Sequence, residues 1–105
     1  MKFFKGATKK ELLIPPSAQT DPNSMEVVRA WIADGGLHCS LNPLIWPEKE
    51  TIGWGILTSD IIRHVADALH RHRGFDKKAT IEEIREALNK ELDAPTAAAD
   101  GDFVQ

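Results

Sequence analysis

Residues 27–41, with the sequence VVRAWIADGGLHCSL, decide the fold. Two β-prone runs flank Asp34-Gly35, and such a pair between strands is a strong hairpin signal, because a type I′ turn needs positive φ at both central residues. Apolar and polar residues then alternate over residues 37–41, as expected of a strand with one apolar face. The stretch predicts a hairpin of residues 27–33 and 37–41.

A second interpretation of this region remains open. Apolar side chains in residues 25–33 also recur at helical spacing, so the alternative is one helix over residues 22–33 that ends at Gly35. Under the hairpin interpretation only a short helix precedes the strands. Asp21-Pro22 suits its start, because Asp can accept free amide hydrogens and Pro fits the first helical position.

A short apolar run at residues 11–14 stands directly before Pro15-Pro16. Proline cannot continue a strand ladder, and it forces the residue before it into an extended conformation. The run therefore predicts a short edge strand near residues 11–14.

Two amphipathic helices are predicted after the hairpin. The first covers about residues 54–73, where apolar side chains recur at helical spacing and Gly74 supplies the left-handed stop. The second covers about residues 80–92 and starts at a capping box formed by Thr80 and Glu83. The apolar stripe of the first helix consists of Leu57, Ile61, Val65, Ala68 and Leu69.

These elements define an α+β fold class. The predicted architecture is a small antiparallel sheet, made of the hairpin and the short strand near 11–14, covered by the two helices. With 105 residues the chain has the length of one domain. We expect a flexible basic arm at residues 1–10, a single α+β domain at residues 11–92 and a disordered acidic tail at residues 93–105.

Composition excludes several classes of function. The 13 Lys+Arg and 16 Asp+Glu residues leave a net charge of −3, and four lysines fall within residues 1–10, so the predicted domain is acidic and nucleic acid is not the expected partner. No apolar run approaches the ~20 residues that span a bilayer, so no membrane partner is expected. The single cysteine, Cys39, excludes an internal disulfide framework and favours a cytoplasmic protein.

Four polar residues are candidates for ligand binding: His38, His64, Asp60 and Arg63. Asp60 precedes His64 by one helical turn, so its carboxylate can orient the imidazole ring and raise the pKa of His64. The simpler interpretation is a boundary histidine on a packed helix, because no second ligand has a defined place. The sequence predicts no catalytic residue, no metal site and no cofactor.

Three tryptophans are a large aromatic content for so small a domain. Trp31, Trp46 and Trp54 are candidate interface residues, because tryptophan is enriched in protein interfaces as well as in cores. We expect one or two in the core and the third at a partner surface.

Residues 26–41 and the later stretches 54–57 and 60–66 resemble a small bacterial family of uncharacterised proteins, a domain of unknown function. The resemblance covers about residues 11–70. It implies a compact single-domain bacterial protein without an established activity, and it carries over no catalytic residue.

The leading functional hypothesis is a non-enzymatic protein-interaction module that forms a homodimer through its sheet, since an open sheet edge must be protected or used. The alternative is a small-ligand or anion-binding domain, or a minor enzyme, that uses His38, His64, Asp60 and Arg63.

Overall fold

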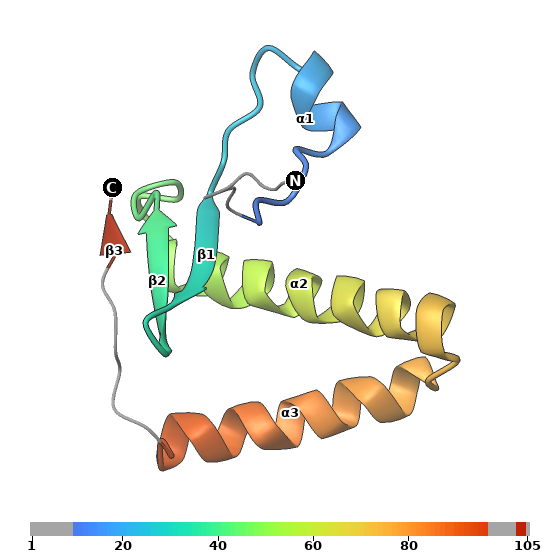
Figure 1. The fold of residues 1–105 in the computed structure, drawn as a ribbon. Coiled ribbons are helices and arrows are strands. Elements are labelled where there is room, and N and C mark those ends of the chain that lie inside the picture. Colours follow the sequence, from blue (N-terminus) through green and yellow to red (C-terminus); the bar gives the residue numbers. More distant parts are fainter. Residues whose placement is uncertain (1–9, 97–102, 105) are drawn as a thin grey trace.

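A computed structural model describes residues 10–96 and 103–104. Almost all of the predicted arm and most of the predicted tail lie outside these described residues. The α+β class is confirmed (Figure 1). The elements in chain order are α1 (Pro16–Thr20), β1 (Val28–Ala33), β2 (Gly36–Leu41), α2 (Glu50–Arg73), α3 (Lys77–Asp93) and β3 (Phe103–Val104).

The predicted hairpin is confirmed. Asp34 has a φ of 51° and Gly35 a φ of 75°, which are the two positive values that its turn requires. β1 and β2 pair antiparallel in a register that places Ala33 opposite Gly36. The alternative helix over residues 22–33 is therefore wrong, because the turn chemistry and the alternating pattern both favour a strand.

The register gives the hairpin one wholly apolar face, because side chains directly opposite each other in an antiparallel pair share a face. This apolar sheet face consists of Val28, Ala30, Ile32, Leu37, Cys39 and Leu41. Its cover decreases toward the turn: Leu41 is partly buried, whereas Leu37 is exposed and Ile32 is 81% exposed. The turn end of the apolar sheet face therefore has no cover within the described chain.

β1 lies at an open edge of the sheet. β2 is the central strand, with β1 antiparallel on one side and β3 parallel on the other. The carbonyl oxygen of Val27 accepts a hydrogen bond from the Asn42 amide (3.1 Å). Because backbone groups alternate in direction along an antiparallel strand, the amide and carbonyl groups of every second residue counted from Val27 point toward β2. The backbone groups of Val28, Ala30 and Ile32 therefore point outward, where the described chain supplies no strand.

The predicted strand near 11–14 does not form. Residues 11–14 lie beside β1 without regular secondary structure, and no backbone hydrogen bond joins them to another described strand. A strand needs a partner, and the third strand of the sheet is instead β3, from the far end of the chain. The apolar run and the prolines predicted an extended segment, but they carry no information about which edge it meets.

The short helix predicted from Asp21-Pro22 lies earlier in the chain. Pro16 occupies the first turn of α1, where its fixed φ suits a helix start, and Asp21 is the C-cap. The Asp21 side chain accepts a hydrogen bond from the Asn23 amide at 2.9 Å. Asp21 therefore forms an Asx turn directly after α1 and does not start a helix.

α2 confirms the first predicted helix and starts four residues earlier than expected. It ends as predicted at Gly74, which has a φ of 72° and donates from its amide to the carbonyl oxygen of His70 (2.9 Å). A side chain at this position would be strained by the left-handed backbone. Gly74 therefore fixes where α2 turns back into α3.

α3 confirms the second predicted helix, but the predicted capping box is wrong. Asp76 is the N-cap, and its Oδ2 accepts a hydrogen bond from the Ala79 amide at 2.9 Å. Thr80 lies inside the helix, where its hydroxyl donates to the carbonyl oxygen of Asp76 (2.7 Å). Asp is as good an N-cap as Thr, so the earlier residue starts the helix and adds almost one turn.

α2 and α3 form a helical hairpin that opens away from Gly74 (Figure 1). Thr80, near the turn, is buried, whereas Leu92 on the last turn of α3 is 72% exposed. Among the described elements, α3 packs on α2, and neither helix makes close backbone contact with the sheet. The predicted cover of the sheet by α3 is therefore not formed within one chain.

Asp67 joins the two helices at the closed end of this helical hairpin. Its carboxylate contacts Arg71 of α2 and Lys77 of α3, each at 3.0 Å. The hydrogen bond from the Lys77 ammonium, aided by the charge of Arg71, lowers the pKa of Asp67. A carboxyl group with a lowered folded-state pKa stabilises the fold above its unfolded pKa of about 3.9 and loses that contribution as pH falls through the folded value.

Asp67→Asn is therefore expected to reduce the loss of stability on acidification. Urea unfolding followed at pH 6 and at about pH 3 measures that loss, which should be larger in the wild-type protein than in the variant. Asp60→Asn, on the same helix but without contact to α3, serves as the control. Equal losses in wild type and Asp67→Asn would contradict this assignment.

The interior of the described chain is very small. Only Gly53, Ala66 and Thr80 are buried among the described residues, and no large side chain is fully buried. Ile61 and Val65, from the predicted apolar stripe of α2, are exposed. A domain of this length normally buries roughly two thirds of its surface, so this chain leaves an unusual share of its apolar surface in water.

Candidate functional site

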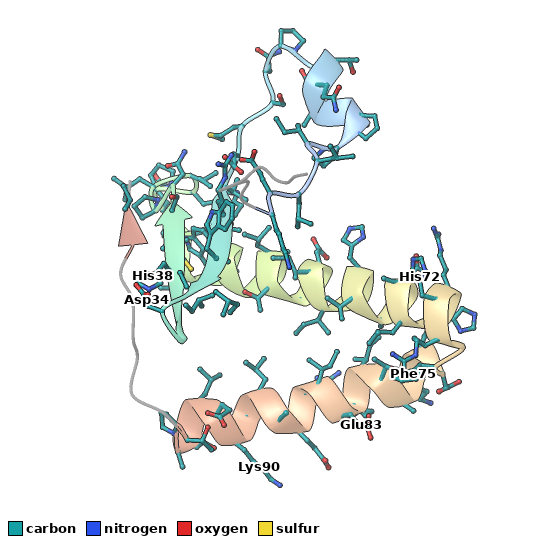
Figure 2. All side chains as sticks on the ribbon, in the orientation of Figure 1. Asp34, His38, His72, Phe75, Glu83 and Lys90 are labelled. Carbon is teal, nitrogen blue, oxygen red and sulfur yellow. The ribbon has the colours of Figure 1, made fainter. Side chains whose placement is uncertain are left out.

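The four residues predicted to bind a ligand do not form one cluster. His38 lies on β2 opposite Trp31, and its Nε2 is 3.1 Å from the carbonyl oxygen of Ala33 (Figure 2). With the proton on Nε2, the His38 ring donates a hydrogen bond to the Ala33 carbonyl oxygen at the turn end of its own hairpin. His38 thus has a local partner that stabilises the turn region.

The other three candidates lie on the exposed surface of α2. Arg63 Nη1 and Asp60 Oδ1 are 3.9 Å apart, and both side chains are largely in water. Ion pairs between solvent-exposed side chains contribute little to folding stability. His64 is exposed, and no hydrogen bond in the described residues joins it to Asp60. Nor does this part of the chain contain a group of three or more His, Cys, Asp or Glu side chains able to hold a metal ion.

Trp46 and Trp54 pack together where the loop after β2 meets α2. Their rings are 5.9 Å apart between centroids at an interplanar angle of 85°, an edge-to-face arrangement. The carboxylate of Glu50 accepts from the Trp46 amide (2.8 Å) and from Trp54 Nε1 (2.9 Å). These two tryptophans therefore attach the loop to the helix.

Trp31 lies in a groove beside the open edge of β1. The groove has a volume of about 610 Å³ and separates the N-terminal segment from β1. Its apolar lining includes Leu12, Leu13, Ile14, Val28, Ala30 and Trp31. We call this feature the β1 groove. Of the three tryptophans, Trp31 is the one that lines this groove.

Arg29 organises the charges at the β1 groove. Its Nη1 is 3.0 Å from Glu11 Oε2, and its Nε is 3.0 Å from Glu26 Oε2. The hydrogen bond to Glu26 and the charge of that carboxylate raise the pKa of Arg29. Glu26 thus holds the guanidinium in place, and Arg29 in turn holds Glu11 beside the β1 edge.

Sequence reasoning missed two features of this molecule. The hydrogen bonds from Trp46 and Trp54 to the Glu50 carboxylate could have been suspected in part, because Glu50 and Trp54 are four residues apart and share a helix face. The β1 groove had none, because Glu11 and Arg29 are 18 residues apart and only the folded chain brings them together.

Comparisons with known proteins were made on the sequence and on the fold. No curated protein matches the sequence. None of the described helices is both long enough and apolar enough to cross a membrane. A solved structure described as "a putative pyruvate dehydrogenase" from the photosynthetic bacterium Rhodopseudomonas palustrus CGA009 is similar, with 29% sequence identity and a TM-score of 0.68. The match covers 94% of this chain and 99% of that chain.

A family model matches most of the sequence. The resemblance stated above for about residues 11–70 is confirmed, and the match extends through α3 to residue 96. It covers the hairpin, the two main helices and the segment that lines the β1 groove. The chain therefore belongs to DUF5076, a domain family of unknown function.

Proposed function

We propose that this chain is a non-enzymatic protein-interaction module that completes its core by pairing with a second copy of itself. The observation that carries the proposal is the absence of any fully buried large side chain in the described residues, although many large aliphatic side chains are present. Exposed apolar surface on this scale is typical of an interaction site. The free Cys39 is consistent with a reducing, cytoplasmic setting.

The surfaces that a second copy would cover are the turn end of the apolar sheet face and the exposed stripe of α2. In a two-fold dimer the same patch is used on both chains, so each residue contributes once from each copy. Ile32, Leu37, Ile61 and Val65 from each copy give eight large aliphatic side chains. Their exposed fractions are 81, 50, 43 and 42%. Burying that exposed surface in both copies gains roughly 6–13 kcal/mol at ~1.5–3 kcal/mol per fully exposed side chain, within the ~4–15 kcal/mol cost of association.

The alternative is a small-ligand domain or enzyme, which the description of the Rhodopseudomonas protein also suggests. A general acid and base must approach within hydrogen-bond reach of one reacting group. His38 on the hairpin turns to the carbonyl oxygen of Ala33, whereas His64 is on the exposed surface of α2. This separation supports the interaction module over an active site built from the histidines.

The proposal predicts that Ile32→Lys weakens self-association at least tenfold. The substitution places a charge on the apolar sheet face, and burying it costs more than the ~1.4 kcal/mol that corresponds to tenfold. Sedimentation equilibrium of the purified protein measures the dissociation constant. Ile32 is already in water in the single chain, so the hairpin itself should form normally.

Ala33→Lys is the matched control. Ala33 is the next residue along β1, is also exposed, and points to the opposite face of the hairpin. It should leave the dissociation constant within about twofold of the wild-type value. A wild-type protein that sediments as a monomer, or equal weakening by the two lysines, would rule the proposal out.

A further inference from the structure

We propose that two copies exchange residues 11–14: the segment of each copy leaves its place beside its own β1 and pairs as an edge strand with the open β1 edge of the other copy. This inference rests on the proposed self-association and specifies one of its contacts. The occupant is the apolar run that the sequence identifies as a strand and that the single chain leaves unpaired.

The receiving surface is the open edge of β1. The amide and carbonyl groups of Val28, Ala30 and Ile32 point away from β2, and none of the other described strands pairs with them. An unpaired edge is a ready template for an added strand, and the backbone hydrogen bonds formed there supply affinity. The adjoining side chains of Ala30 and Trp31 give the β1 groove an apolar wall.

The donated segment has the properties of a missing strand. Leu12 is 91% exposed and Leu13 is 93% exposed, so both gain from burial in a groove. Among the described residues, no backbone–backbone hydrogen bond involves residues 11–14, and the Ile14 carbonyl accepts from the Gln19 side chain (2.7 Å). Four extended residues span about 13 Å, close to the length of the outward-facing part of β1. Pro15-Pro16 would then end the strand, because a proline has no amide hydrogen to donate to the strand ladder.

Two further observations make exchange between copies feasible. Residues 15–27 connect the segment to β1. With the five residues of α1 helical and the other eight extended, they reach at most ~35 Å, which allows a reach to a neighbouring chain. Figure 1 shows this connection, including α1, as an excursion away from the sheet and α2. The Glu11 contact to Arg29 marks where an incoming carboxylate would bind. In such an exchange, the same segment of each chain takes the place beside β1 that it has in its own chain, but on the other copy.

Disulfide trapping between two differently tagged copies tests the inference. Both copies carry Cys39→Ser. The first copy carries Leu13→Cys, or Leu12→Cys in a parallel sample, and the second carries Ala30→Cys. Mixing under mild oxidation should give a disulfide-linked heterodimer with at least one of the two segment cysteines, because opposed residues in paired strands meet the geometry of a disulfide. Non-reducing electrophoresis identifies the product by size.

The control replaces Ala30→Cys by Ser40→Cys, an exposed position on the central strand β2. It should give at most a tenth of the heterodimer. Sedimentation of the same samples separates the two proposals. Dimers without the Ala30 cross-link would overturn the strand exchange and leave self-association standing, whereas monomers would overturn both. A monomeric intrachain disulfide in a chain carrying Leu13→Cys and Ala30→Cys, with no heterodimer on mixing, would also overturn it.

Discussion

Gly53→Ala is expected to destabilise the protein by about 1–2 kcal/mol. A methyl group at this position would overlap the ring of Trp46, which lies directly against the Gly53 backbone. Alanine gains up to about 1 kcal/mol over glycine in a helix interior, but overpacking typically costs about 1–3 kcal/mol. The overlap should decide the sign, because Trp46 is also held in place by its contacts with Trp54 and Glu50.

Gly55→Ala is the matched comparison on the same helix. A methyl group at Gly55 meets no atom within 4 Å, so only the helix propensity changes and the protein should gain about 0.5–1 kcal/mol. Urea unfolding at one fixed protein concentration measures both variants. Shifts in the same direction for the two alanines would contradict the packing described for Trp46.

Glu50→Ala is expected to cost about 2–4 kcal/mol. The Glu50 carboxylate accepts hydrogen bonds from the Trp46 amide and from Trp54 Nε1, and all three residues are partly buried. Removing the acceptor leaves two donors without a partner, at about 1–3 kcal/mol for each unsatisfied group. The loop after β2 should also loosen, which a red shift of the tryptophan fluorescence would report.

Glu48→Ala controls for the loss of a carboxylate from the same loop. Glu48 is exposed, and no hydrogen bond or ion pair of its side chain is found in the described residues. Its removal should change the free energy of unfolding by less than about 0.5 kcal/mol and leave the fluorescence unchanged. If Glu50→Ala behaved in the same way as Glu48→Ala, the carboxylate would not be the contact that holds the two tryptophans.

Features that depend on a few neighbouring residues were predictable from the sequence. Asp34-Gly35 specifies its turn through backbone conformation alone, and Gly74 ends α2 for the same reason. The hairpin and both main helices follow from such local rules. The start of α3 was misplaced because Thr80 and Glu83 match a capping box, although Asp76, four residues earlier, is at least as good an N-cap as Thr80.

Features that depend on distant partners were not predictable. Residues 11–14 have the composition of a strand, but pairing depends on what lies next to them in space, and in the single chain the third strand is β3. The same limit applies to the cover of the sheet. An apolar stripe at helical spacing shows that the stripe must be buried, but not that the cover comes from the same chain.

The candidate site shows the same division. Spacing along α2 places Asp60, Arg63 and His64 within a turn of one another, because residues three and four apart on a helix are neighbours, but only Asp60 and Arg63 make a contact, at 3.9 Å. It gave no information on the distance from that group to His38 on the hairpin. The sequence likewise named Trp31 and the run at residues 11–14 separately, and only the folded chain brings them to one groove.

The concentration dependence of unfolding tests most directly whether a second copy completes the core. When folding is coupled to association, mass action makes the urea midpoint rise with protein concentration. Over about a hundredfold range of concentration, we predict a steadily rising midpoint, together with a native mass twice the 11.7 kDa of one chain. A constant midpoint with the mass of a single chain throughout that range would contradict the account.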